Sequence, residues 1–132
     1  MPVVPAGREC PCGARGCWEH YATGDAMVRW PVASRPGVAR CRGNPTAVEA
    51  VRRVGEWLRI GIAELCAGLD PELVVVGGGV SQAGDLLLGP ARAALSQTLP
   101  GRGFRPVPPI VAAALGADAS MVGAALMAGA HG

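Results

Sequence analysis

Three cysteines near the start of the chain lie close enough together to bind a metal ion. Cys10, Cys12 and Cys17 form the pattern C-x-C-x4-C, and intervening glycines let the backbone fold tightly between them. Three soft thiolates suit a tetrahedral Zn²⁺, which takes one further ligand. The alternative is three ordinary reduced cysteines in a loop. We favour zinc, because clustered exposed thiols are otherwise prone to oxidation.

The fourth ligand of such a site is left open by the sequence. His20 would extend the pattern to C-x-C-x4-C-x2-H, but a histidine at the surface is the more common interpretation. Water or a group from another chain could complete the site instead. Cys41 and Cys66 stand apart from the cluster, and we expect both to be small, inert residues.

Helices are predicted on both sides of a surface connection at about residues 31–45. A short helix is expected from about Cys17 to Trp30. A long helix follows, with Asn44 as its N-cap, Pro45 at its first position and Gly68 as its C-terminal stop. Its apolar residues recur at helical spacing along one face: Val48, Val51, Val54, Leu58, Ile62, Leu65 and Leu69.

Two short apolar runs predict strands of a parallel sheet. Leu73–Val76 and Ile110–Ala114 show no alternation, which is typical of strands buried on both faces. A helix from about Gln82 to Leu99, broken at Gly89-Pro90, is expected between them. The last helix, about Ala117–Ala130, is rich in small residues, so it can approach a sheet closely.

This order of elements predicts an α/β fold with βαβ connections. Two parallel strands make a poor sheet, because each would have an open edge and a bare face. Further strands must therefore come from elsewhere, or the chain is part of a larger domain.

A run of three glycines marks a candidate ligand site at the end of the first strand. Gly77, Gly78 and Gly79 lie where open α/β sheets bind ligands, and glycines let the backbone approach a nucleoside closely. The helix that follows offers free N–H groups to anions. A tight turn would need one or two glycines in any case, so the triplet alone does not decide its role.

Composition excludes several classes of function. The 132 residues carry a formal net charge of +2, and the basic residues are all arginines spread along the chain, whereas a nucleic-acid surface needs a concentrated stripe. No apolar run reaches the ~20 residues that span a bilayer, and the first residues do not form a signal peptide. We therefore expect a cytoplasmic protein with no nucleic-acid or membrane partner.

Longer motifs resemble the ROK family (repressors, open reading frames and kinases), in particular its bacterial glucokinases. Cys10–Glu19 matches the family's zinc signature, C-x-C-G-x-x-G-C-x-E, and Tyr21–Gly24 is similar to its Tyr-Ala-Ser-Gly. Leu69–Ser81 resembles the strand and glycine loop beside the nucleotide. Leu115–Ala119, with Gly123–Ala125, resembles the closing helix. The resemblance runs nearly from end to end.

The resemblance implies the C-terminal βαβα portion of an actin-like, ribonuclease-H-like ATPase domain, preceded by a Cys-rich zinc loop and helices. Residues 1–24 would form the zinc- and sugar-binding loop, and residues 45–132 the nucleotide side. The three cysteines would bind a structural zinc, and the upstream histidine that is the fourth ligand in the family has no counterpart here, which leaves His20 or another group to complete the site. Glu19 would contact hydroxyls of a hexose, and Gly77–Gly79 would bind ATP, which acts with Mg²⁺ in intact relatives.

Two catalytic elements of the family have no counterpart here. These are the phosphate-binding Asp-x-Gly-Gly-Thr turn and the Asn-Asp segment that supplies the base. Met1–Pro5 resembles the segment that follows the family's zinc histidine. Asp25, Asp70, Asp85 and Asp118 lie in no matching context, so no catalytic residue is assigned.

The sequence thus predicts the C-terminal half of an ATP-dependent kinase that phosphorylates the 6-hydroxyl of glucose or a similar hexose in intact relatives. We expect it to be inactive alone, and either to form a homo-oligomer or to need the N-terminal half. Two alternatives remain: the sugar-sensing half of a ROK transcriptional repressor, although no helix-turn-helix is present, or the product of a decayed, truncated gene.

Overall fold

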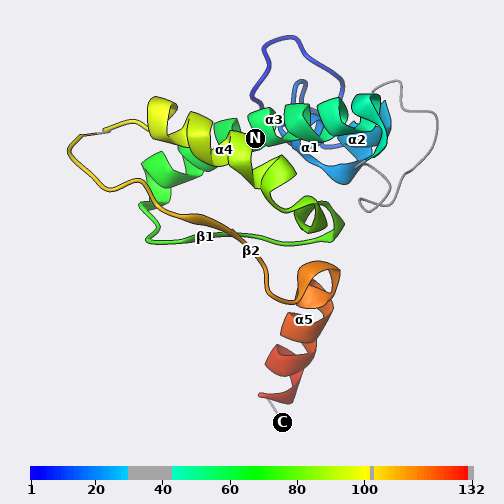
Figure 1. Ribbon diagram of the computed structural model, residues 1–132, viewed down its shortest axis with the longest axis vertical. Coiled ribbons are helices and arrows are strands. Elements are labelled where there is room, and N and C mark those ends of the chain that lie inside the picture. The colour runs from blue at the N-terminus through cyan, green and yellow to red at the C-terminus, as the bar shows by residue number, and fades with distance from the viewer. Residues whose placement is uncertain (30–42, 102, 131–132) are drawn as a thin grey trace.

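The structure is a computed structural model that describes residues 1–29, 43–101 and 103–130 (Figure 1). In chain order the elements are α1 (Glu19–Ala22), α2 (Gly24–Arg29), α3 (Pro45–Leu69), β1 (Val74–Val76), the 3₁₀ helix η2 (Gly79–Ala83), α4 (Asp85–Thr98), β2 (Ile110–Ala112), the 3₁₀ helix η3 (Gly116–Asp118) and α5 (Ala119–Gly129). Helices α3 and α4 lie on one side of the two strands, and α5 leaves on the other side. This arrangement confirms the α/β class.

Helix α3 begins as its sequence predicts. The Asn44 side chain accepts hydrogen bonds from the backbone N–H groups of Thr46 (3.0 Å) and Ala47 (3.3 Å), and Pro45 occupies the first turn. These contacts satisfy N–H groups that have no partner within the helix.

The end of α3 differs from the prediction. Gly68 does not stop the helix, which continues to Leu69 and ends at Asp70 in the left-handed conformation (φ 46°). Arg105 closes this end by pairing with Asp70 and donating to the Cys66 carbonyl (2.8 Å). The predicted apolar face is also too long, because Leu65 and Leu69 are exposed at 45% and 74%.

The core lies between α3 and α4, and small residues let the two helices approach closely. Helix α3 buries Val51, Val54 and Cys66, and α4 buries Leu87 and Leu95 against them. The inert role expected of Cys66 agrees with this position. Cys41 lies outside the described residues.

The predicted break at Gly89-Pro90 is wrong. Helix α4 runs through Pro90, and the break comes earlier, at Gly84, which has a positive φ (55°). Proline normally disrupts a helix interior because it lacks an N–H and crowds the preceding turn. Here Gly55 of α3 faces Leu87 and Pro90, and because it has no side chain the two helices pack closely at this point. This packing accompanies the continuation of α4 through Pro90, where one backbone hydrogen bond is missing.

The two strands pair in parallel, as predicted, with Val74 opposite Ile110 and Val76 opposite Ala112. The prediction that they are buried on both faces is wrong for the described part of the chain. Ile110 is buried against the helices, whereas Val75 is 56% exposed and Val111 is 36% exposed. The second strand is also shorter than expected, since it ends at Ala112.

The predicted terminal helices also change. The stretch from Cys17 to Trp30 is interrupted at Thr23, whose extended backbone separates α1 from α2 (Trp30 is outside the described residues). The small residues of the last helix would allow a close approach to a sheet, but in the described chain α5 has no buried residue and extends away from the two strands (Figure 1). In the portion of the chain that the structure covers, no helix is long and apolar enough to cross a membrane.

Candidate functional site

The cysteine loop is folded by hydrogen bonds between its two ends. Val3 N–H donates to the Gly16 carbonyl (2.8 Å), and Trp18 N–H donates to the Met1 carbonyl (2.8 Å). Gly16 has a positive φ (70°), and a Cβ added there would lie 1.8 Å from the Val4 carbonyl oxygen. The motif therefore requires glycine at this position, because any side chain would separate the paired segments.

The loop brings the three predicted metal ligands together. The sulfur atoms of Cys10, Cys12 and Cys17 all lie within 4.8 Å of one another, and those of Cys12 and Cys17 are 3.5 Å apart. Zn–S bonds of about 2.3 Å in a tetrahedron place sulfurs roughly 3.8 Å apart. Cys17 is buried and Cys12 exposed, so the cluster lies at the surface with one side open. These residues fit a zinc ion.

Proximity also sets the protonation of the thiols. Hydrogen bonding with Cys12 raises the pKa of Cys17 to about 11, and desolvation and Cys10 act in the same direction. The pKa of Cys12 is lowered, chiefly by a backbone hydrogen bond from Ala14 and then by the neighbouring thiols. Without a cation the cluster thus holds Cys17 as the thiol, whereas a bound metal would favour the thiolate.

Two aromatic residues attach the loop to α3. Trp18 Nε1 donates to the Trp57 carbonyl (2.8 Å), and the rings of Tyr21 and Trp57 have centroids 4.7 Å apart. The Trp18 ring fills the space above Gly61, where an added Cβ would be 2.2 Å from ring atom Cε2. Sequence analysis missed these residues. The sequence signal that could have found Trp18 is Gly61, a glycine on the buried face of a long helix.

Replacing Gly61 with valine is expected to displace the Trp18 ring from α3 and expose it to water. We expect a red shift in tryptophan emission and a loss of order in the cysteine loop, because ring and side chain cannot share the space. Fluorescence in a background with both Trp30 and Trp57 replaced by phenylalanine would isolate the Trp18 signal, because the chain has three tryptophans. An unshifted emission would contradict this packing.

A cavity of about 260 Å³ opens beside the cysteine cluster. Glu19, the first residue of α1, lines it and is exposed. The other lining residues are Cys10, Pro11, Cys12, His20, Thr23 and Asp25. His20 therefore shares the cavity with two cysteines but does not belong to the cluster of three sulfurs. The cavity thus places the Glu19 carboxylate beside the cysteine loop, and a carboxylate in such a position can accept hydrogen bonds from hydroxyl groups of a ligand.

The glycine turn lies at the carboxyl ends of both strands. Gly78 follows β1 with φ 79°, a conformation that favours glycine, and Ser81 Oγ donates to its carbonyl (2.7 Å). Side chains at Gly78 or Gly79 would meet no atom within 4 Å, so this turn has open space above it. The η2 turn also contacts η3, which follows β2. Open α/β sheets bind ligands at this position.

The two parts of the site are in contact with each other. A methyl group added at Gly24, the first residue of α2, would lie 3.0 Å from Val80 Cγ2 in η2. Ala26 is buried in the same core as Ala83. The segment that carries Glu19 is therefore packed against the glycine turn, although more than fifty residues of sequence separate them.

Comparisons with known proteins agree over most of the chain. A glucokinase of Streptomyces coelicolor is 38% identical over 151 residues, covering 96% of this chain and 48% of that protein. The crystal structure of a ROK family glucokinase from Streptomyces griseus, in complex with glucose and AMPPNP, superposes with a TM-score of 0.82 at 36% identity. It matches 96% of this chain and 49% of its own.

A ROK family transcriptional regulator shares the fold alone, with a TM-score of 0.69 at 20% identity over 85% of this chain. The chain spans about half the length of the curated glucokinases that it matches. The sequence pattern of the ROK family matches residues 1–131. The chain therefore belongs to the ROK family.

Proposed function

We propose that this chain is the C-terminal half of an ATP-dependent hexose kinase domain of the actin-like type. Residues 1–24 form its zinc- and sugar-binding part, and residues 45–132 its nucleotide-binding part. The observation that carries this proposal is the contact between Gly24 and Val80, which joins the Glu19 segment to the glycine turn. A kinase needs its two substrates side by side, because phosphoryl transfer depends mainly on positioning.

Each element has a distinct role in the proposed site. Cys10, Cys12 and Cys17 would hold zinc, whose contribution is to fix the loop geometry. Glu19, at the start of α1, accepts hydrogen bonds from sugar hydroxyls. The turn at Gly77–Gly79 lets the nucleoside approach the backbone at the strand ends, and ATP enters with Mg²⁺. The residues described here position substrates, and the proton acceptor and phosphate turn come from the part of the domain that this chain does not span.

Kinase parentage is favoured over a repressor. Glucokinases match at 36–38% identity, whereas the transcriptional regulator matches at 20% and supports the fold only. The cavity beside Glu19 is compatible with sugar binding in either class. A measurement of activity therefore distinguishes a kinase from a repressor.

The test replaces the matching half of the Streptomyces coelicolor glucokinase with this chain. We expect the chimera to consume ATP in a glucose-dependent manner, and the isolated chain to show no such activity in a coupled assay. Glu19→Gln should lower kcat/KM of the chimera about 10- to 100-fold, since a charged hydrogen bond contributes about 1.5–3 kcal/mol.

Glu9→Gln provides the matched control, because Glu9 is exposed in the same loop and pairs with Arg15 (2.9 Å) outside the cavity. It should leave kcat/KM unchanged. An inactive chimera that is folded and binds zinc would refute the kinase proposal. Turnover by the isolated chain would refute its dependence on a second half.

A further inference from the structure

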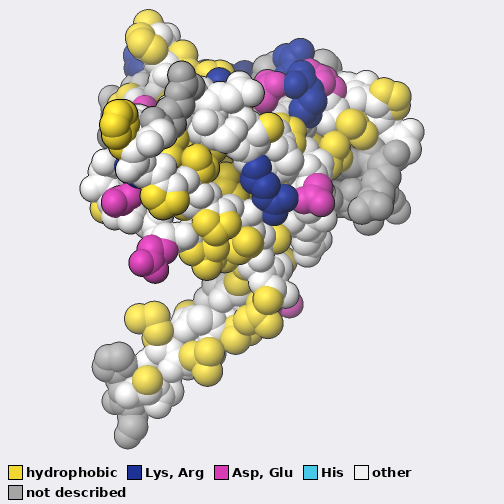
Figure 2. Space-filling view, turned by 60° about the vertical axis from the view of Figure 1, so that its left-hand side comes forward, with side chains coloured by type: hydrophobic (Ala, Val, Ile, Leu, Met, Phe, Trp, Pro, Cys, Tyr) yellow, Lys and Arg dark blue, Asp and Glu magenta, His cyan; other side chains and the backbone are white. Residues whose placement is uncertain are grey.

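One side of the molecule exposes apolar groups that a stable domain would cover. We call this side the apolar face, and it consists of Val75, Val111 and helix α5. The two valines are opposite each other in the parallel register, so both point away from α3 and α4. Helix α5 has no charged residue, and Met121 and Leu126 are each 69% exposed. Figure 2 shows hydrophobic side chains spread along the arm that extends below the body.

Such a helix does not stand alone in water. A helix that is apolar on all sides is typical of one surrounded by other structure. An isolated helix of 11 residues is also too short to be stable by itself. Within the described chain, α5 has substantial contacts only with η3. A second body must therefore pack around it.

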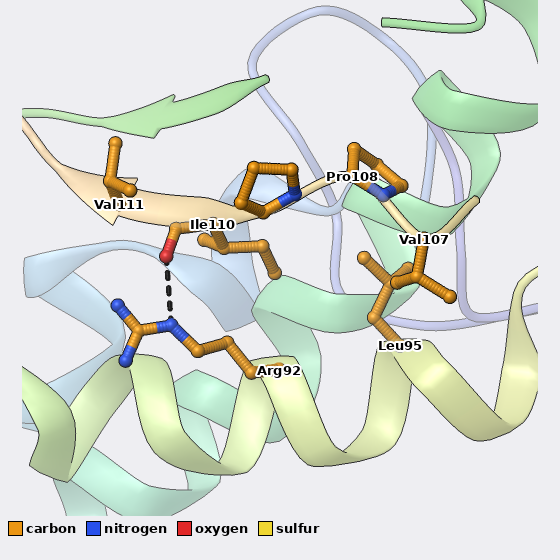
Figure 3. Close-up of a pocket in the computed structure, with 7 residues that line it drawn as sticks. Arg92, Leu95, Val107, Pro108, Ile110 and Val111 are labelled. Carbon is orange, nitrogen blue, oxygen red and sulfur yellow. Dashed lines mark hydrogen bonds between the residues drawn. The ribbon is translucent and has the colours of Figure 1, made fainter. Parts of the chain in front are cut away.

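The outer edge of β2 is closed to further strands. Val111 bonds to β1, so Ile110 and Ala112 direct their backbone groups away from it. Arg92 Nε donates to the Ile110 carbonyl (2.8 Å), and Arg92 Nη1 pairs with Asp85 (2.6 Å). Figure 3 shows this hydrogen bond from Arg92 to the strand, beside the pocket that Val107 and Pro108 line. An incoming strand would have to displace it.

The outer edge of β1 is open. Val74 N–H donates to the Pro109 carbonyl, and Ala113 N–H donates to the Val76 carbonyl, so Val74 and Val76 face β2. Val75 therefore directs its N–H and carbonyl to the opposite side. The sheet formed by the described residues has two strands, and none lies beyond β1. Exposed edges of this kind pair readily with another segment.

We propose that the apolar face and the β1 edge together bind the part of a ROK domain that this chain does not span. That polypeptide adds a strand beside Val75 and packs apolar side chains on Val111 and around α5. The inference rests on the proposed function for the identity of its partner. About half of the Streptomyces griseus glucokinase has no counterpart here, which provides a partner of the required size.

A second copy of the chain fits this surface less well. A twofold pair would bring the same edge to each β1, and those strands have three residues each. A ladder between two such strands would have few hydrogen bonds. It would also leave α5, which projects away from the strands, without a further sheet or helix layer around it. The bare face, the open edge and the helix instead require a partner with different structure.

The experiment co-expresses the chain with the half of Streptomyces griseus glucokinase that it does not match. Affinity purification, sedimentation and titration should give a one-to-one complex. Val75→Pro should weaken association at least tenfold, because it removes the outward N–H while leaving the bonds to β2. Ala112→Pro is the matched control, since its N–H faces the closed edge, and it should bind as the unmodified chain does.

Leu126→Lys tests α5 separately and should also weaken association at least tenfold, whereas Phe104→Lys, on an exposed loop away from the apolar face, should not. Failure to form the complex, or equal binding by Val75→Pro and Ala112→Pro, would overturn the proposal. A homodimer that Val75→Pro abolishes would assign the face to a second copy instead. Because the readout is mass and affinity, an inactive chimera would refute the kinase function without affecting this result.

Discussion

The purified chain is expected to contain about one zinc ion per molecule, and Cys10→Ser to contain almost none. Three sulfurs within 4.8 Å supply most of a tetrahedral site, and removing one leaves two ligands. The loop should lose order with the metal, because binding free energy of a structural zinc contributes directly to folding. Metal analysis by mass spectrometry measures the stoichiometry, and proteolysis of the loop measures its order.

Cys66→Ala is the control for loss of a thiol, since Cys66 is buried in α3 and does not belong to the cluster. It should retain the zinc. Binding should also weaken as the pH falls, because the metal takes thiolates and the pKa of Cys17 is raised to about 11 without it. Full zinc content in Cys10→Ser would show that the cluster is not the metal site.

Local features of the sequence predicted the parts of the site that are close in the chain. The cysteine spacing predicted the sulfur cluster because glycines close a loop of few residues. Asn44 and Pro45 predicted where α3 begins, because capping depends on neighbouring backbone groups. The glycine run correctly predicted a turn at the end of β1.

Features that depend on distant segments were not predictable in the same way. Val75 lies in a run typical of a doubly buried strand, but no described segment of the chain covers its outer face. The same reason explains why α5 has no buried residue. The residue types thus suit a strand and a helix that are covered on all sides, whereas the described part of the chain covers the strand on one face only.

The contact between Glu19's segment and the glycine turn also required the structure. Gly24 and Val80 meet only because α2 and η2 both pack on the core between α3 and α4. No periodicity or spacing in the sequence links them. The resemblance to ROK proteins supplied the roles of these segments, and the packing supplied their proximity.

Replacing Gly55 with alanine is expected to destabilise the chain by about 1–3 kcal/mol or more, the range for overpacked cores. A Cβ at this position would lie 2.4 Å from the Leu87 carbonyl oxygen and 3.5 Å from Pro90 Cβ. The nearest atom belongs to the backbone, so no side-chain rotation relieves the clash, and α3 and α4 must separate. Urea unfolding followed by tryptophan fluorescence measures the loss.

Gly68→Ala makes the same chemical change in the same helix and separates packing from helix propensity. A Cβ at Gly68 meets no atom within 4 Å, so alanine there should stabilise α3 by about 0.5–1 kcal/mol. Since alanine is also the better helix former at Gly55, a loss of stability at that site reports the helix contact alone. Equal effects of the two substitutions would mean that α3 and α4 do not approach at Gly55. The absence of a side chain at Gly55 would then have no bearing on how α4 continues through Pro90.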